Sequence, residues 1–123
     1  MPWAFPDAPA AIGPYSQAVR HGDLVFLSGQ IPLDPATMEI VGETAAEQAR
    51  QALTNAKNVV EAGGYTLDDV VKVTVFIMDM GEFANINEVY TGFFGSEPPA
   101  RSVVEVARLP KDVLVEIEMI AYR

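Results

Sequence analysis

The segment VVKVTVFIM, residues 70–78, has the composition and the alternation of a β-strand. β-Branched side chains favour extended backbone, and successive side chains along a strand point to opposite faces. Lys72 and Thr74 are therefore expected on one face. The opposite face is expected to consist of Val71, Val73, Val75 and Ile77. Apolar residues also occur on the first face, so this strand requires burial on both sides.

Four further segments have strand character. They are residues 15–20, 24–31, 102–107 and 113–121. The first two flank His21-Gly22-Asp23, a short turn that is typical of a β-hairpin. A turn-rich stretch follows them, and it has room for one more short strand over 38–41.

Two segments have the periodicity of amphipathic helices. Thr44 and Glu47 have the spacing of a capping box, and Gly63-Gly64 is a helix stop signal. The apolar face of this first helix is Ala49, Leu53, Ala56 and Val60. Asp79 and Glu82 repeat the capping spacing before a second helix that ends near Gly95. Its apolar stripe is Phe83, Ile86, Tyr90, Phe93 and Phe94.

The order of the elements predicts an α+β fold, with two helices packed on one face of a mixed sheet. We expect a single domain over residues 1–123, with an irregular N-terminal strap over 1–13 that is rich in proline. Two helices cannot cover both faces of the sheet, yet strands 24–31 and 70–78 are apolar on both faces. The uncovered face therefore predicts packing against further copies of the chain in a closed ring.

Composition excludes several classes of function. The chain has no cysteine, so it forms neither disulfides nor thiolate metal sites, and it has one histidine, His21, expected to be an exposed turn residue. No metal-ligand or nucleotide-binding motif occurs, so no metal or cofactor is predicted. A net charge of -9 disfavours nucleic acid. No apolar run is long enough to span a membrane and no targeting segment is recognisable, which predicts a soluble intracellular protein.

Arg101 is the first candidate for a binding residue. It follows Pro98-Pro99-Ala100, whose restricted backbone fixes where the side chain emerges. A guanidinium in this position can hold a carboxylate through two parallel hydrogen bonds, with backbone donors at Ser102 and Val103 nearby. From residue type alone, an ordinary ion pair with one of the 17 acidic residues is the simpler interpretation.

Glu116 and Glu118 are candidates for acid–base chemistry. They are two positions apart in a strand, so both point to the same face. The apolar residues that alternate with them should face the helices, which leaves the two carboxylates on the open face. Partial burial there would raise a carboxyl pKa toward the range of a general acid or base. Without further information, two solvated glutamates are the simpler interpretation.

Several segments together resemble the Rid family, also called the YjgF family, of reactive-intermediate deaminases. They are GPYSQA (13–18), SGQIP (28–32) and PARSVVEVARLPKDVLVEIEMIA (99–121), and the resemblance continues over nearly the whole chain from about residue 8. It implies a chorismate-mutase-like α+β subunit, a cytoplasmic homotrimer with active sites in the clefts between subunits, and no cofactor. The implied reaction is hydrolysis of 2-aminoacrylate/2-iminopropanoate and 2-iminobutanoate to 2-keto acids and ammonia.

The resemblance also implies roles for individual residues. Arg101 would grip the substrate carboxylate, and Glu116 would activate water and handle the proton of the leaving ammonia. Four other residues would shape the pocket: Tyr15, Ser28, Gly29 and Asn87. Val103 stands where the family often has cysteine, which leaves only its backbone N–H for the ligand.

Two other functions remain open at this point. The first is a non-catalytic trimer that binds small carboxylates, since some relatives with this fold are poor deaminases. Arg101 fits both functions, whereas Glu116 favours the enzyme because a pure binder has little need of a proton-handling group. The second is the ribonuclease or translation-inhibitor activity attached to some family members, which the acidic charge disfavours.

Overall fold

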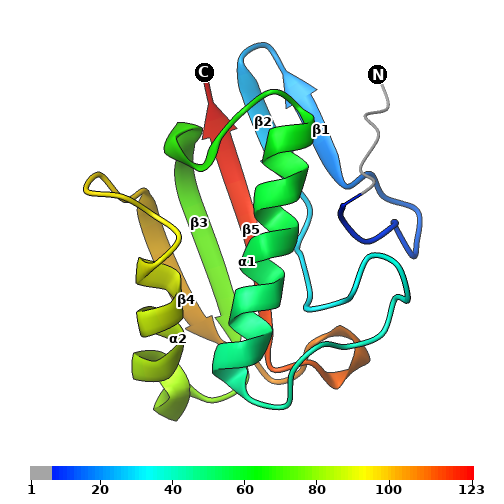
Figure 1. Cartoon of the computed structure of the whole chain (residues 1–123), viewed down its shortest axis with the longest axis vertical. Coiled ribbons are helices and arrows are strands. Elements are labelled where there is room, and N and C mark those ends of the chain that lie inside the picture. Colours follow the sequence, from blue (N-terminus) through cyan, green and yellow to red (C-terminus); the bar gives the residue numbers. More distant parts are fainter. Residues whose placement is uncertain (1–6) are drawn as a thin grey trace.

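The computed structural model describes residues 7–123, and Figure 1 shows its arrangement. The predicted N-terminal strap lies partly outside the described residues. Its remaining part, residues 7–13, contains neither helix nor strand. Among residues 7–123, no helix combines the length and the apolar character needed to cross a membrane.

Five strands form one mixed sheet in the order β1-β2-β5-β3-β4 (Figure 1). Their bounds are Ala18–His21 (β1), Leu24–Leu27 (β2), Val70–Ile77 (β3), Ala100–Glu105 (β4) and Val115–Tyr122 (β5). Strand β3 pairs in parallel with the edge strand β4, and the other neighbours are antiparallel. The C-terminal strand β5 therefore lies in the middle of the sheet, between β2 and β3.

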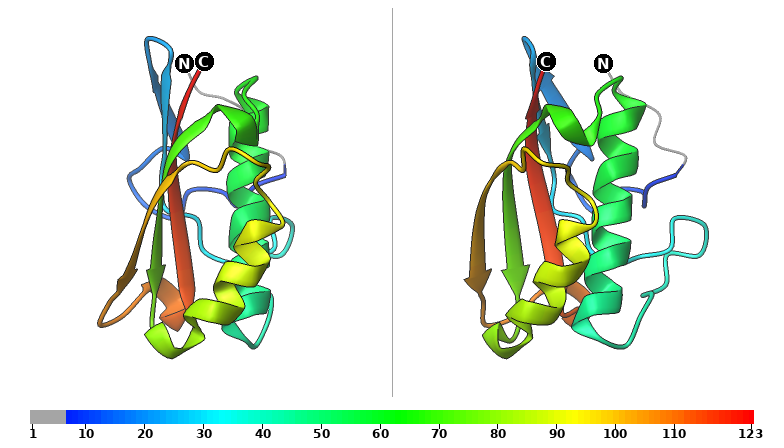
Figure 2. Two further views of the ribbon diagram at one scale, coloured as in Figure 1. Left: turned by 90° about the vertical axis from the view of Figure 1, so that its left-hand side faces the viewer. Right: turned by 60° about the vertical axis from the view of Figure 1, so that its left-hand side comes forward.

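Two helices, α1 (Ala45–Ala62) and α2 (Phe83–Thr91), lie on the same side of the sheet (Figure 2). The α1 helix begins with the predicted capping box, in which the Thr44 hydroxyl accepts from the Glu47 amide and Glu47 accepts from the Thr44 amide. Short 3₁₀ turns cover Leu67–Asp69 (η1), Met80–Glu82 (η2) and Pro110–Asp112 (η3). The predicted α+β architecture with both helices on one face is confirmed.

Some predicted strand bounds were wrong. The strand predicted over 24–31 ends at Leu27, because Ser28 and Gly29 leave the ladder before Gln30 forms an isolated bridge with Ile117. The first strand covers Ala18–His21 instead of 15–20, and His21 ends it instead of lying in the turn. The strand predicted over 38–41 is reduced to a single bridge between Leu33 and Ile40.

The predicted face of Val71 was also wrong. Val70 pairs with Ala121 and Lys72 pairs with Ile120, so Val71 is an extra residue in β3 with no partner in β5. Such a bulge interrupts the alternation of side chains. Val70 is consequently buried beneath the helices, whereas Val71 is 46% exposed.

The main core lies between the sheet and the two helices. Strands β3 and β5 contribute its centre through side chains that are almost completely buried: Val73, Val75, Ile77, Val115, Ile117 and Met119. A smaller cluster of Ile31, Leu33, Leu109 and Val113 packs against Phe76 and Met78. Because Phe76 and Met78 alternate with Val75 and Ile77, this second cluster covers one end of the face opposite the helices, which we call the open face.

The rest of the open face carries apolar side chains without cover from within the described chain. Val19 pairs with Phe26, and Phe26 pairs with Ile120, so these three residues share that face. Val19 is 56% exposed and Phe26 is 42% exposed. The expectation that both faces of the sheet have apolar residues is therefore confirmed for the chain itself.

A buried amide from α1 fixes the segment that follows β2. Asn55 is completely buried, and its side-chain nitrogen donates to the carbonyls of Ile31 (3.1 Å) and Leu33 (2.9 Å). Buried amides without partners are costly, so these bonds constrain the segment strongly. The adjacent Ser28 and Gly29 are thereby held at the border between sheet and loop.

Candidate functional site

Arg101 lies near the start of β4 on the helix-covered side of the sheet. Its Nη1 donates to the Oδ1 of Asn87 in α2 at 2.8 Å. The guanidinium carbon lies 4.6 Å from the centre of the Tyr90 ring and 5.5 Å from that of Phe83. Within residues 7–123, Arg101 forms no ion pair with an acidic residue, and the ion pair found there joins Arg108 to Asp112. The simpler interpretation of Arg101 as an ordinary ion-pair residue is therefore wrong for these residues.

A cavity of about 400 Å³ opens beside Arg101. Tyr90 and Phe94 form aromatic walls, and Pro98 and Pro99 form the side that belongs to the loop before β4. Asn87 also lines it, so the structure brings Arg101 together with one of the four predicted pocket residues. A half-buried guanidinium with unused N–H groups at such an opening can bind an anion with planar oxygen geometry.

Glu116 lies in β5 on the open face of the sheet, opposite Phe76 of β3. It is half-buried, and partial burial raises the pKa of its carboxyl group, with a further contribution from the negative charge of Glu118. Within residues 7–123 no hydrogen bond from a protein donor contributes to this shift. The prediction that Glu116 and Glu118 share one face is confirmed, because they pair with Phe76 and Thr74 of β3. The raised pKa of Glu116 agrees with the expected effect of partial burial.

A second cavity of about 400 Å³ contains Glu116 together with Tyr15, Ser28 and Gly29. Gly29 lets the carboxylate lie against the backbone, because a Cβ atom at this position would displace the Glu116 side chain. The Ser28 hydroxyl donates to the carbonyl of Ser16, which joins the loop containing Tyr15 to the end of β2. Three of the four predicted pocket residues therefore lie around Glu116, and the fourth lies beside Arg101.

The two cavities are on opposite faces of the sheet within one chain. Val73 pairs with Arg101, and paired residues share a face, so Arg101 lies on the helix-covered face with the buried Val73. Phe76 pairs with Glu116 and lies three positions further along β3, which places both on the open face. A single chain thus presents the cation and the carboxylate as two separate half-sites.

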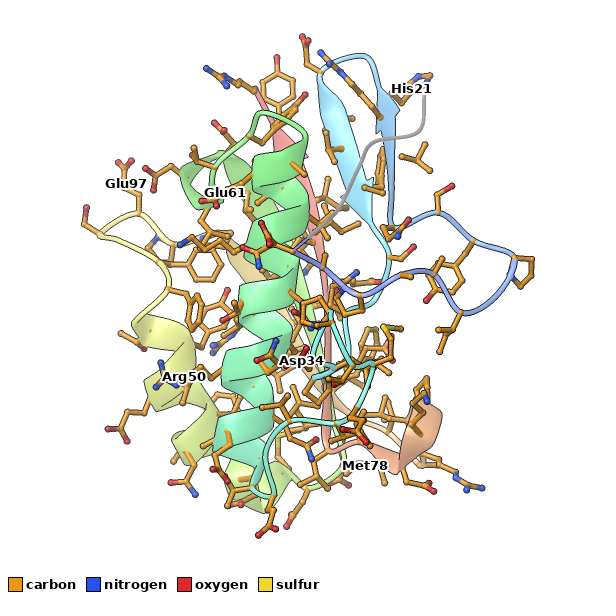
Figure 3. All side chains as sticks on the ribbon, turned by 45° about the vertical axis from the view of Figure 1, so that its right-hand side comes forward. His21, Asp34, Arg50, Glu61, Met78 and Glu97 are labelled. Carbon is orange, nitrogen blue, oxygen red and sulfur yellow. The ribbon has the colours of Figure 1, made fainter. Side chains whose placement is uncertain are left out.

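The remaining predicted residues occupy simpler positions. Val103 pairs with Val75, and its partly buried side chain packs against the main core near Arg101. Figure 3 shows His21 at the hairpin end of the molecule and Met78 at the other end. The backbone amide of Met78 donates a hydrogen bond to the carbonyl of Leu114, two residues before Glu116. His21 is exposed there. No cluster of three potential metal ligands occurs within residues 7–123.

Sequence reasoning missed the aromatic contacts of Arg101 and one wall of the Glu116 cavity. Phe83 and Tyr90 were assigned to a core stripe, although their spacing from Asn87 places all three on one face of α2. Pro110, in the turn η3, lines the Glu116 cavity. No local sequence pattern predicts this contact.

Comparison with known proteins agrees with this fold. The profile described as endoribonuclease L-PSP matches residues 5–123. The chain therefore belongs to that family, which is the Rid/YjgF family indicated by the sequence motifs.

Several relatives are similar over nearly their whole length. A RutC family protein of Pyrococcus horikoshii is 57% identical, covering 95% of this chain and 93% of that protein. The 2-iminobutanoate/2-iminopropanoate deaminase of Escherichia coli is 54% identical, with the same shares covered. The crystal structure of E. coli TdcF with bound serine superposes with a TM-score of 0.95 at 51% identity, covering 100% of this chain and 98% of that chain.

Proposed function

We propose that this protein hydrolyses short 2-imino acids, such as 2-iminopropanoate and 2-iminobutanoate, to 2-keto acids and ammonia. The observation that carries the proposal is Glu116, a half-buried carboxylate with a raised pKa and no protein donor within residues 7–123. A carboxylate in this condition is suited to accept and return a proton. Similarity to relatives named 2-iminobutanoate/2-iminopropanoate deaminase supports the same reaction.

The chemistry requires binding, orientation and one proton relay. Arg101 binds the substrate carboxylate, so that C2 of the imine faces Glu116. The substrate reacts as its iminium form: the water oxygen bonds to C2, Glu116 accepts a proton from that water, and the C=N π electrons become the lone pair of the amino nitrogen. Glu116 then returns this proton to the amino nitrogen of the carbinolamine. The C–N bond breaks as the C2 carbonyl forms, and the departing ammonia takes the hydroxyl proton and leaves as ammonium. The imine is already electrophilic, so proximity and acid–base assistance are sufficient without a cofactor.

The separation of the two half-sites supports the proposal that neighbouring chains share each active site. The Arg101 cavity of one subunit would meet the Glu116 cavity of the next, and the exposed apolar residues of the open face would be buried in the same assembly. We propose a homotrimer in the cytoplasm, as the resemblance to the Rid family implies. Tyr15, Ser28 and Gly29 would then come from the subunit that supplies Glu116, while Asn87 and the Val103 backbone would come from the subunit that supplies Arg101.

A second candidate function is non-catalytic binding of small carboxylates. The Arg101 cavity favours it, because an anion site alone is sufficient for a regulatory ligand. The bound serine in the similar structure of E. coli TdcF carries such a carboxylate. The ribonuclease activity in the family's description has less support, since the net charge of -9 opposes binding of a phosphate backbone.

The two candidates separate in one assay. A threonine dehydratase generates 2-iminobutanoate in solution, and release of 2-oxobutanoate is followed with and without this protein. We expect the wild type to accelerate release, Arg101→Ala to abolish the acceleration, and Glu116→Gln to reduce it by roughly 100-fold or more, the usual contribution of a general base. No acceleration by folded wild-type protein, together with binding of 2-oxobutanoate, would establish the non-catalytic function instead.

A further inference from the structure

Three residues of α2 contact the Arg101 side chain, and they form one face of that helix. Phe83, Asn87 and Tyr90 occupy positions i, i+4 and i+7. Such residues align along a helix surface, and seven residues rise about 10 Å. The guanidinium carbon lies 5.5 Å from the Phe83 ring centre and 4.6 Å from that of Tyr90, so both rings are within reach of a cation–π contact.

The arrangement limits how the guanidinium can turn. Asn87 Oδ1 engages Nη1 at 2.8 Å, and the two aromatic rings attract the cation from either end of the helix face. A guanidinium is planar and stacks on aromatic rings, whereas an ammonium group does not. The N–H groups that Asn87 leaves unused remain available at the cavity that Arg101 lines.

We propose that Phe83 and Tyr90 are positioning residues that orient the Arg101 guanidinium for a ligand carboxylate. They act through Arg101 and not by contact with the reacting atoms. This inference rests on the role given to Arg101 in the proposed function. It extends that role from one arginine to an aromatic clamp built by α2, which we define as Phe83 and Tyr90.

The ring of Tyr90, and not its hydroxyl, carries this role. Tyr90 is 6% exposed, and its hydroxyl oxygen is buried with no hydrogen-bond partner within residues 7–123. A buried hydroxyl without a partner stabilises nothing and is inaccessible to a ligand. Tyr90→Phe therefore removes the unpartnered group and keeps the aromatic face, which makes it the matched control for Tyr90→Leu.

The experiment compares Tyr90→Phe, Tyr90→Leu and Phe83→Leu with the wild type. Two quantities are measured: the affinity for 2-oxobutanoate, by calorimetry, and the kcat and KM for 2-iminobutanoate hydrolysis. Cation–π contacts are stronger when desolvated, so we expect Tyr90→Leu to lower the affinity and raise KM by about tenfold each. For Phe83→Leu we expect changes of about threefold in the same directions. Tyr90→Phe should weaken affinity and raise KM less than Tyr90→Leu does, because Phe presents a comparable ring face to the cation.

A purely structural role for the two rings predicts a different pattern. Loss of packing would lower the melting temperature and the amount of active protein, which lowers kcat per chain and leaves KM unchanged. Phe83 is 37% exposed, so Phe83→Leu is the variant least affected by loss of packing. An unchanged KM and an unchanged affinity in folded Phe83→Leu and Tyr90→Leu would overturn the inference.

The outcomes also separate this inference from the proposed function. If the wild type binds 2-oxobutanoate but hydrolyses no imine, the deaminase proposal fails, and the affinities of the leucine variants still decide the role of the clamp. If the wild type hydrolyses imines and both leucine variants match Tyr90→Phe, the clamp fails and the deaminase stands. A wild type that binds no carboxylate at all overturns both.

Discussion

The Arg101 region and the Glu116 region of this protein are built in opposite ways. Arg101 is held by groups of its own chain, namely the amide of Asn87 and two aromatic rings of α2. Glu116 has no such partners within residues 7–123, and its surroundings are mostly segments of loop and strand end at Tyr15, Ser28 and Gly29. The helix-covered face thus holds a guanidinium that is oriented by its own chain, whereas on the open face the Glu116 carboxylate has no hydrogen-bond donor within residues 7–123.

This difference shows how a small sheet can separate two charged groups of opposite sign. The central strands β5 and β3 isolate the two groups, because adjacent positions of each strand point to opposite faces. Each half-site can be stabilised without the charge of Glu116 neutralising that of Arg101. The pKa of Glu116 reflects this separation, since it is raised by burial and by Glu118 and is not lowered by a nearby cation.

The largest predicted effect comes from combining two inactive variants. If each site uses Arg101 of one chain and Glu116 of its neighbour, co-expressing Arg101→Ala with Glu116→Gln creates some sites in which both groups are intact. Random assembly of a closed ring restores about a quarter of the wild-type sites. Imine hydrolysis by the mixed preparation, measured against each variant alone, checks this expectation.

A suitable control is co-expression of Arg101→Ala with the double variant Arg101→Ala/Glu116→Gln, which cannot form an intact site. The comparison between the two regions would break down if the mixed preparation and this control were equally inactive while both retained the wild-type oligomeric state. In that case the two half-sites would not meet between chains.

The next largest effect is predicted for Gly29→Ala. An added Cβ would lie 2.0 Å from the Glu116 Oε2, so the carboxylate must move. A displacement of about 1 Å at a catalytic group costs on the order of a hundredfold in rate. We expect kcat to fall by that factor while the affinity for 2-oxobutanoate, which depends on Arg101, changes little.

Gly92→Ala is the matched glycine control. Gly92 has a φ of -71°, which alanine adopts readily, and its added Cβ would approach no atom closer than 3.4 Å. This variant should keep wild-type kcat. Equal losses in Gly29→Ala and Gly92→Ala would show that the effect is a general consequence of substitution and not a displacement of Glu116.

Local patterns predicted the parts of the site that depend on one strand or one helix. Alternation along β5 was sufficient to place Glu116 and Glu118 together on the open face, and the capping box at Thr44 located the start of α1. Both features arise from contacts over a few residues. The sequence also predicted a strand from residue 102, directly after the proline-restrained segment, and β4 begins two residues earlier, at Ala100.

Non-local geometry could not be read from those patterns. The opposite faces of Arg101 and Glu116 follow from the parallel register of β3 with β4 and the antiparallel register of β3 with β5, which only the folded sheet reveals. The bulge at Val71 reversed one predicted face, because an extra residue breaks the alternation from which the prediction was made. The family resemblance selected Arg101 and Glu116. The contacts of Phe83 and Tyr90 with Arg101 could not be predicted in this way, because they join α2 to β4 in the folded chain.

A smaller effect is predicted for the pH dependence of hydrolysis. Burial first, and Glu118 second, raise the pKa of Glu116, so the acidic limb of kcat/KM should lie above the usual glutamate value of 4.5. Activity requires the ionised carboxylate and should fall as pH decreases through the raised pKa. Glu118→Gln removes the negative neighbour, and we expect this limb to move to lower pH.

The exposed substitution Glu88→Gln is the control for this shift, because Glu88 lies on α2 and outside both cavities. If the acidic limb of kcat/KM in Glu118→Gln stays where it is in the wild type, the charge of Glu118 does not raise the pKa of Glu116.

The raised pKa of Glu116 also makes the stability of the fold depend on pH. Glu116 contributes its full stabilisation below its unfolded pKa and loses that contribution as pH rises through its folded pKa. Glu116→Gln should therefore raise the melting temperature relative to wild type at neutral pH more than at low pH.

The smallest effect is predicted for a second arginine, Arg108. It forms a two-bond pair with Asp112, with Nε to Oδ1 at 2.7 Å and Nη2 to Oδ2 at 3.2 Å, and this raises the pKa of the guanidinium and lowers that of the carboxyl group. Both side chains are largely exposed, at 75% and 68%, where water and salt weaken such pairs. Arg108→Ala should leave imine hydrolysis, KM and the melting temperature essentially unchanged.

The contrast between Arg108 and Arg101 tests what makes an arginine functional in this chain. Arg108 has the better ion-pair geometry, whereas Arg101 has aromatic rings, a neutral amide and a cavity. If function depends on leaving N–H groups free at a half-buried opening, only Arg101→Ala abolishes binding of 2-oxobutanoate. A comparable loss of affinity in Arg108→Ala would mean that general positive charge attracts the carboxylate, because Arg108 lines neither the Arg101 cavity nor the Glu116 cavity. Measuring both variants at low and high salt separates these causes, since screening weakens long-range attraction much more than contact in a half-buried site.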